Sequence, residues 1–165
     1  MKMQKYLVVI AILVLASGCS STKKTSEQRA EAKAIKQQEI VQAIENNNYV
    51  VKARSLYTGR NTYLNLRPDH NYIVINGNMA RVNLAYVGRS FSTRPITAIN
   101  LSGRIEGMSI SLKKKGSRLI KFSVEENGEK FDIYLHASRS GDCKIDVINP
   151  RIDNISYVGR IETSL

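Results

Sequence analysis

Residues 72–86 read YIVINGNMARVNLAY, and this stretch decides the class of fold. Asn76-Gly77 separates two runs in which apolar and polar residues alternate. An Asn-Gly pair between β-rich runs is a strong hairpin signal, because both turn residues must accept a positive φ. The stretch therefore predicts two antiparallel strands that each have one buried and one exposed face.

The same pattern continues toward the C-terminus. Gly116-Ser117, Asn127-Gly128 and Ser140-Gly141 mark three further turns. Together with residues 49–56 and 62–66, about eight strands fit into a single β domain over residues 49–162. The residues predicted to share apolar faces are Met108, Ile110 and Leu112 in one strand, Ile120, Phe122 and Val124 in the next, and Phe131, Ile133 and Leu135 in the third.

A series of adjacent hairpins with one apolar face must close on itself or be covered by another layer. We expect a mainly β fold, a small antiparallel meander that closes into a lipocalin-like barrel, because closure removes exposed strand edges. A two-sheet β-sandwich is the alternative. One N-terminal α-helix is predicted over residues 26–47, where Thr25 and Gln28 fit a capping box and good helix formers follow.

The N-terminus has the features of an export signal. Its apolar run, YLVVIAILVLA at residues 6–16, is shorter than the about 20 residues that a helix needs to cross a bilayer. Its length and its basic flank are typical of a signal peptide. Leu15-Ala16-Ser17-Gly18-Cys19 resembles the lipobox of bacterial lipoproteins, in which the cysteine thiol accepts the lipid; an ordinary secretory peptide is the alternative. The predicted segments are a signal peptide over residues 1–18, a lipidated Cys19, and a lipidated tether over residues 19–25.

The charge balance indicates anionic partners. Removal of Lys2 and Lys5 with the signal peptide leaves 23 basic residues against 14 acidic ones, a formal charge of +9. Such a balance favours lipid headgroups or polyanionic glycans outside the cytoplasm. The chain has no Trp and three Phe, which argues against a stacking groove for single-stranded nucleic acid. We therefore expect no nucleic-acid partner.

No catalytic constellation is present in the sequence. His70 and His136 are the two histidines, and their spacing does not indicate a zinc site. Asp132 and Asp146 fall on polar strand faces, where carboxylates usually face water. Cys143 alternates with Ile145 and Val147, so we expect it to pack as a small buried hydrophobe. The prediction is a protein that is not an enzyme and uses no metal and no cofactor.

The pattern Tyr-x-Gly-Arg occurs three times, at residues 57–60, 86–89 and 157–160. In the second and third copies the tyrosine and the glycine fall on the apolar face. A glycine there makes a bend or bulge, or leaves room for a ring against bare backbone. The residues interpreted as structural are Tyr86, Gly88, Tyr157 and Gly159. The alternative is a functional one, in which Arg60, Arg89 and Arg160 converge on one anion.

Two segments carry a family resemblance. LAYVGRSFS at residues 84–92 and NPRIDNISYVGRIE at residues 149–162 resemble the signatures of an uncharacterised Bacteroidetes lipoprotein family, domain of unknown function 4251. The first signature of that family commonly reads Leu-Pro-Tyr-aromatic-Gly-Arg, so Ala85 and Val87 depart from it. The resemblance implies one domain in a Gram-negative envelope, with no established activity, cofactor or catalytic residue.

The residues after Cys19 bear on localisation in such an envelope. Ser20 follows the cysteine, where an aspartate would favour retention in the inner membrane. Residues 20–26 lack the acidic cluster that resembles a surface-export tag in Bacteroidetes lipoproteins. We expect a lipid anchor in the outer membrane and a domain that faces the periplasm.

Two functions remain open at this stage. Residues 88–107 form a segment that is long for a hairpin connection, and long ordered loops are often functional. One hypothesis is an interaction or structural lipoprotein that docks another envelope protein. The other is a β-barrel binding module for a small apolar or anionic ligand, gated by residues 88–107. The candidate contacts with ligand or partner are Arg89, Phe91, Arg94 and Arg104.

Overall fold

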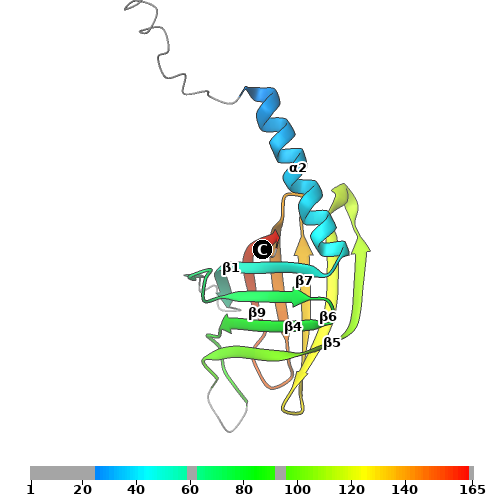
Figure 1. The fold of residues 1–165 in the computed structure, drawn as a ribbon. Coiled ribbons are helices and arrows are strands. Elements are labelled where there is room, and N and C mark those ends of the chain that lie inside the picture. The colour runs from blue at the N-terminus through cyan, green and yellow to red at the C-terminus, as the bar shows by residue number, and fades with distance from the viewer. Residues whose placement is uncertain (1–24, 59–62, 92–95, 164–165) are drawn as a thin grey trace, which may run out of the picture. The chain divides into compact units, whose positions relative to one another are not determined.

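The computed structural model describes residues 25–58, 63–91 and 96–163. The chain divides into two compact units, residues 1–31 and residues 32–165, and the β domain lies in the second. Cys19, Gly59, Arg60 and Arg94 lie outside the described residues. The elements in Figure 1 are helix α2 (Ser26–Glu45), strands β1 (Asn48–Thr58), β2 (Tyr63–Asn65), β3 (Tyr72–Asn76), β4 (Met79–Ala85) and β5 (Ala98–Leu112), the 3-10 turn η1 (Lys114–Gly116), and strands β6 (Arg118–Glu126), β7 (Glu129–Ala137), β8 (Asp142–Ile148) and β9 (Ile155–Thr163).

The strands form one antiparallel sheet that closes on itself. Strands β3 to β9 pair in chain order, and β1 pairs with β3 along one edge and with β9 along the other. Eight strands therefore make a closed barrel, and β2 is an extra short strand that extends the β3 edge of β1. The predicted barrel is confirmed, and the sandwich alternative is wrong.

The hairpin turns follow the glycine signals, with one correction. Asn127 and Gly128 both have positive φ, 54° and 75°, between the paired residues Glu126 and Glu129. That turn uses its Asn-Gly pair as predicted. In the first hairpin, however, Asn76 pairs with Met79, so the two loop residues are Gly77 and Asn78. Of these only Gly77 has a positive φ, because a loop with glycine first needs one such residue rather than two.

Apolar side chains fill the inside of the barrel. The predicted apolar faces of β6 and β7 point inward, as do alternate residues of the other strands. Burial of this face supplies most of the driving force for the fold, about 25 cal/mol for each Å² of apolar surface removed from water. The largest fully buried side chains of the core are Tyr49, Leu56, Ile73, Ile75, Leu84, Ile120, Ile133, Leu135, Ile145, Ile155 and Tyr157, with Ile44 of α2.

Strand β5 corrects two expectations from the sequence. The segment 88–107 is not one long connection, because residues 98–107 belong to β5 and pair with β4 and β6. The apolar face predicted for Met108, Ile110 and Leu112 is also not buried as a whole. Met108 is partly buried, whereas Ile110 and Leu112 are exposed. The cause is a bulge between Glu106 and Ser109, where Gly107 has a φ of 59° and the strand bends away from β4.

Helix α2 contacts one end of the barrel through its last turns. Its buried residues are Ile40, Ala43 and Ile44. The helix ends at Glu45, two residues before the predicted end, and Asn47 then adopts a φ of 50°. At its start, Thr25 and Gln28 form the capping box: each backbone N–H donates to the side-chain oxygen of the other residue, at 3.2 and 3.4 Å.

The glycine of the third motif copy lies at the seam that closes the barrel. Gly159 in β9 pairs with Ala53 in β1, beside a bulge between Ala53 and Ser55. A Cβ atom at position 159 would overlap the carbonyl oxygen of Lys52 and lie 2.9 Å from the Cα atom of Ala53. Both of these are backbone atoms, which a rotamer change cannot move.

We predict that Gly159→Ala lowers the free energy of unfolding by about 1–3 kcal/mol, because β1 must shift away from β9 to admit the methyl group. Urea titration followed by circular dichroism measures this change. Val158→Ala is the matched control on the same strand, since it alters an outward-facing side chain and should stay within about 0.5 kcal/mol of wild type. If Gly159→Ala left the stability unchanged, the close approach of the β1 backbone to Gly159 would be contradicted.

Candidate functional site

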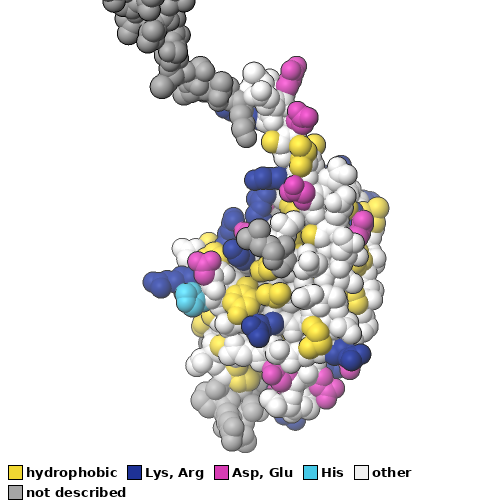
Figure 2. All heavy atoms as spheres, viewed as in Figure 1, with side chains coloured by type: hydrophobic (Ala, Val, Ile, Leu, Met, Phe, Trp, Pro, Cys, Tyr) yellow, Lys and Arg dark blue, Asp and Glu magenta, His cyan; other side chains and the backbone are white. Residues whose placement is uncertain are grey.

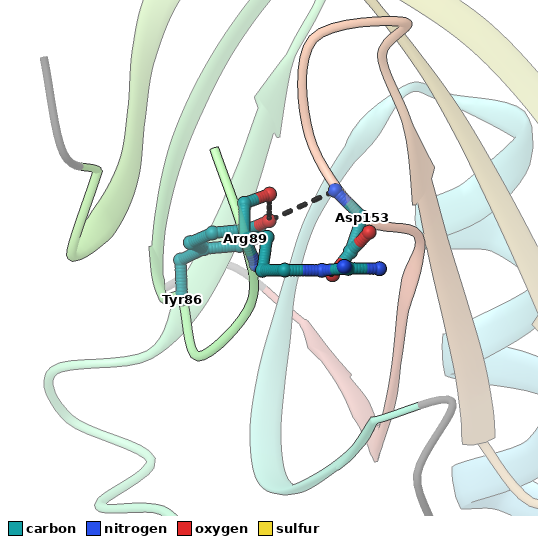
Figure 3. Close-up of polar contacts among 3 residues, drawn as sticks. All are labelled: Tyr86, Arg89 and Asp153. Atoms are coloured by element: carbon teal, nitrogen blue, oxygen red, sulfur yellow. Dashed lines mark hydrogen bonds and ion pairs between the residues drawn. The ribbon is translucent and has the colours of Figure 1, made fainter. Parts of the chain in front are cut away.

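Tyr86 anchors the segment that follows β4. Its ring lies against Gly88, where a Cβ atom would come within 2.7 Å of the ring carbon Cζ. Its hydroxyl donates to the carbonyl oxygen of Arg89 at 2.7 Å and accepts the backbone N–H of Asp153 at 2.9 Å. Figure 3 shows Tyr86, Arg89 and Asp153 meeting from two segments far apart in the chain.

Arg89 and Asp153 complete this junction. The backbone N–H and the Nε–H of Arg89 donate to Oδ2 of Asp153, at 3.1 and 3.3 Å. The N–H of Asp153 also reaches the carbonyl oxygen of Arg89, at 3.0 Å. The side-chain ion pair is exposed, and such pairs contribute about 0–1 kcal/mol. The junction therefore depends mainly on the buried tyrosine and the backbone hydrogen bonds.

Tyr157 makes the reciprocal contact from the third motif copy. It is fully buried, and its hydroxyl donates to the carbonyl oxygen of Ala85 at 2.9 Å. Burial raises the pKa of Tyr157 above the ordinary range, so the hydroxyl stays protonated and able to donate. Each tyrosine thus bonds to the backbone beside the other motif. We call Tyr86, Arg89, Asp153 and Tyr157 the tyrosine clasp.

The clasp accounts for the structural motif residues without a ligand. Tyr86 and Tyr157 bond to backbone, Gly88 makes room for a ring, and Gly159 makes room for the β1 seam. The first copy has no such role within the described residues, because Tyr57 is exposed and lies edge-on to Tyr63 with ring centroids 5.0 Å apart.

The arginines of the second and third copies do not converge on one anion. Arg89 contacts Asp153, whereas Arg160 donates to the carbonyl oxygen of Ser140 at 2.9 Å and lies 3.6 Å from Asp142. Asp153, the partner of Arg89, precedes β9, and Arg160 lies five residues after the first residue of that strand, about 17 Å at 3.3 Å per residue. The hypothesis of a shared anion site is therefore wrong for Arg89 and Arg160.

The predicted contact residues fall into separate places. Phe91 is 65% exposed, with the guanidinium carbon of Arg89 lying 5.9 Å from its ring centroid. The backbone N–H of Phe91 donates to the carbonyl oxygen of Arg151 at 2.8 Å, and this fixes the segment. Arg104 lies elsewhere, on β5 opposite Met79. The structure thus groups Arg89 with Phe91 and leaves Arg104 apart.

A hollow of about 250 Å³ lies beside Ile152, the residue before Asp153 of the clasp, at the end of the barrel that carries the β6–β7 turn. Its floor is apolar, and its polar lining includes Glu126 and Glu129 rather than arginines. The expected mouth flanked by basic residues is therefore not formed by the described residues. The apolar lining residues are Ile96, Ala98, Ile99, Leu101, Phe131 and Ile152.

Basic residues concentrate in the first half of the domain. Residues 46–105 contain eight Lys or Arg residues and one acidic residue, Asp69. Figure 2 shows Lys and Arg side chains around hydrophobic ones on the face that carries β1 and β3–β5. Arg81 and Arg104 lie on neighbouring strands of this wall, and neither forms an ion pair within the described part of the chain. Arg60 and Arg94 lie outside the described residues, and Lys52 and Arg89 are paired with Glu162 and Asp153, so the unpaired positive charge of this wall comes from arginines such as Arg81 and Arg104. We call it the electropositive wall.

The remaining reactive side chains do not assemble a catalytic site. Cys143 is buried inside β8, and burial raises the pKa of its thiol to about 12, so no thiolate forms at neutral pH. His136 lies 3.4 Å from Asp146 on the outer face, and Lys144 shares the same carboxylate at 2.9 Å. Among the described residues, no three His, Cys, Asp or Glu side chains are placed to hold a metal ion.

Two buried asparagines, which the sequence analysis missed, support the clasp. Asn71 accepts the backbone N–H of Ala85 at 2.7 Å and donates to the carbonyl oxygen of Arg67 at 3.0 Å. Asn149 donates to the carbonyl oxygen of Lys130 at 2.9 Å and accepts the N–H of Arg151 at 2.8 Å. Asn71 directly precedes β3 and Asn149 directly follows β8, both in turn-like stretches, and this is the signal that could have indicated a side chain bonding to backbone.

Comparison with known protein families confirms the family that residues 84–92 and 149–162 resemble. A family model described as domain of unknown function (DUF4251) matches residues 31–161. The chain belongs to the DUF4251 family. A crystal structure of a DUF4251 family protein from Bacteroides eggerthii DSM 20697 is similar to it, with a TM-score of 0.68 and 17% sequence identity over 81% of this chain and 91% of that one. At that identity the similarity concerns the fold. The comparison with curated proteins found no match.

We predict that Tyr86→Phe lowers the free energy of unfolding by about 1–3 kcal/mol, because the N–H of Asp153 and the carbonyl of Arg89 both lose the hydroxyl. Chemical denaturation measures the loss. Tyr57→Phe removes a hydroxyl from an exposed ring of the same type and should change stability by less than about 0.5 kcal/mol. Equal effects of the two substitutions would mean that the Tyr86 hydroxyl in the clasp stabilises the fold no more than the hydroxyl of an exposed tyrosine.

Proposed function

We propose that this DUF4251 protein is a non-catalytic lipoprotein anchored to the outer membrane through Cys19, with its barrel facing the periplasm as an interaction module for another envelope protein. The lipobox-like segment at residues 15–19 supports the anchor. No helix within the described residues is long and apolar enough to cross a membrane. Three acyl chains would hold such a protein at the membrane stably, where one chain would be marginal.

The observation that carries the interaction role is the exposed aromatic side chain at the clasp. Phe91 and Val87 are both exposed beside Arg89, and the clasp holds their segment by backbone hydrogen bonds. Aromatic side chains and arginine are enriched in the parts of interfaces that carry most of the binding energy. A segment that is already rigid loses little conformational entropy when it binds.

The electropositive wall supports a partner with an acidic surface. Complementary charge mainly raises the association rate and selects among partners, and a membrane anchor already limits diffusion to a surface. The alternative function, a barrel that binds a small ligand inside, would need interior space. The inward positions are occupied by buried side chains of all eight barrel strands, so we favour contact through the outer surface.

For the anchor, we predict that Cys19→Ser abolishes incorporation of a labelled palmitate analogue and blocks processing, since serine offers no thiol for the diacylglycerol. Metabolic labelling and fractionation of the envelope measure both effects. Cys143→Ser is the control, because that thiol is buried and should play no part in lipidation. Unchanged labelling of Cys19→Ser would contradict the lipid anchor.

For the contact, we predict that a photo-crosslinking residue at position 91 captures one discrete envelope protein in intact cells. The same residue at position 158 is the control, because Val158 is exposed on β9 and does not belong to the segment that carries Phe91. Phe91→Ala should weaken the captured complex by about tenfold or more, the loss expected of an aromatic side chain in a central contact. Capture of lipid alone at position 91 would contradict a protein partner.

A further inference from the structure

The second half of β5 leaves the barrel wall. Up to Arg104 the strand pairs with β4, and the backbone N–H of Ile105 still donates to the carbonyl oxygen of Asn78 at 2.8 Å. Beyond the bulge at Gly107, residues 109–112 pair with β6 on one side. Within the described chain, no strand pairs with residues 106–112 on the other side. Figure 1 shows this half of β5 rising along the side of the barrel.

This free edge starts at the bulge beside Glu106, and its residues beyond that charge carry neither of two other features that usually prevent edges from pairing. In an antiparallel strand, alternate residues turn their N–H and C=O groups away from the existing neighbour, so the edge offers unpaired backbone groups. Natural edges are commonly blocked by a proline or a central charge. Residues 107–112 read GMSISL and contain neither. Ile110 is 40% exposed and Leu112 is 71% exposed.

The edge is complementary to itself. If two copies pair antiparallel with Ile110 opposite Ile110, then Met108 lies opposite Leu112 and Ser109 lies opposite Ser111. Apolar side chains then meet apolar ones on one face and hydroxyls meet on the other. The lysines at positions 113–115 of each copy lie beyond the end of the strand, near Glu106 of the other copy. A parallel pairing would instead place the two lysine clusters together, which repulsion disfavours.

We propose that two copies of this protein associate through residues 106–112 of β5, paired antiparallel about Ile110, so that the sheet continues from β6 of one copy into β6 of the other. The partner strand adds backbone hydrogen bonds, as in other cases of strand addition. It also places its own Met108, Ile110 and Leu112 opposite Leu112, Ile110 and Met108 of the first copy. This surface is separate from the Phe91 contact, and the proposal does not depend on the lipid anchor.

A groove beside the edge offers further buried area. It has a volume of about 460 Å³ between the second half of α2 and the end of β5. Leu112 and Val41 contribute apolar lining, and Arg118 and Arg139 lie at its polar side. A second copy seated on the edge covers Leu112 and narrows this groove. The apolar face that β5 leaves exposed is then buried in the dimer.

Cysteine crosslinking in isolated envelopes tests the pairing and its register. The probe is Ile110→Cys in the full chain, oxidised with copper-phenanthroline, since Cys143 is buried and does not interfere. We expect a covalent dimer at twice the monomer mass, and none from Ser102→Cys, which is exposed in the first half of β5. A monomer from Ile110→Cys overturns the proposal, and a dimer from Ser109→Cys alone overturns this register.

A charge substitution tests the same edge without a crosslink. Ile110→Lys should convert the detergent-solubilised dimer to a monomer in light scattering, because two lysines would then face each other across the two-fold axis. Val158→Lys is the matched control, since Val158 has the same 40% exposure on another strand. A wild-type monomer, or a dimer that survives Ile110→Lys, overturns the proposal. Circular dichroism verifies that both variants fold.

Discussion

The two hydroxyl groups of Tyr86 and Tyr157 are the contacts on which the loop end of the barrel depends. A buried hydroxyl without a partner costs about 1–3 kcal/mol, so each must find a backbone group in the folded state. Tyr157 finds Ala85, and Tyr86 finds Arg89 and Asp153. The bonds of Tyr157 to Ala85 and of Tyr86 to Asp153 join the end of β4 to the start of β9, across 72 and 67 residues of the chain. The clasp therefore ties the connection after β4 to the last strand, in addition to the β1–β9 pairing that closes the sheet.

Closure determines what the protein can do. An eight-stranded barrel has an interior that side chains can fill or that can hold one small ligand, and in this one buried side chains of its own strands point inward. This filling is the reason we propose recognition through the outer surface. On the outer surface, backbone hydrogen bonds hold the segment with the exposed pair Arg89 and Phe91, and beyond the bend at Gly107 the second half of β5 is unpaired on one side within the described chain. A lipid anchor would keep both surfaces close to the membrane.

Local patterns predicted much of the fold, and the failures have a common physical cause. Alternation over β6 and β7 fixed which residues point inward, since the side-chain period of a strand is two. The same alternation could not show that β5 bends at Gly107, because a bulge breaks the period of two at that point. The sequence indicated Tyr86, Gly88, Tyr157 and Gly159 as structural, but it did not indicate what the two tyrosines bond to. Their partners Asp153 and Ala85 could not be predicted, because hydrogen bonds over 67 and 72 residues follow from barrel closure, not from local sequence.

The most direct test of this account is a double-mutant cycle with Tyr86→Phe, Tyr157→Phe and the combined variant, each measured by chemical denaturation. If the two tyrosines hold one junction together, their effects on the free energy of unfolding will be coupled by about 0.5–3 kcal/mol, as for residues that share a network. Loss of one bond would already loosen the segment that the other fixes. Strictly additive effects would contradict the account and would mean that the two motifs stabilise the barrel independently.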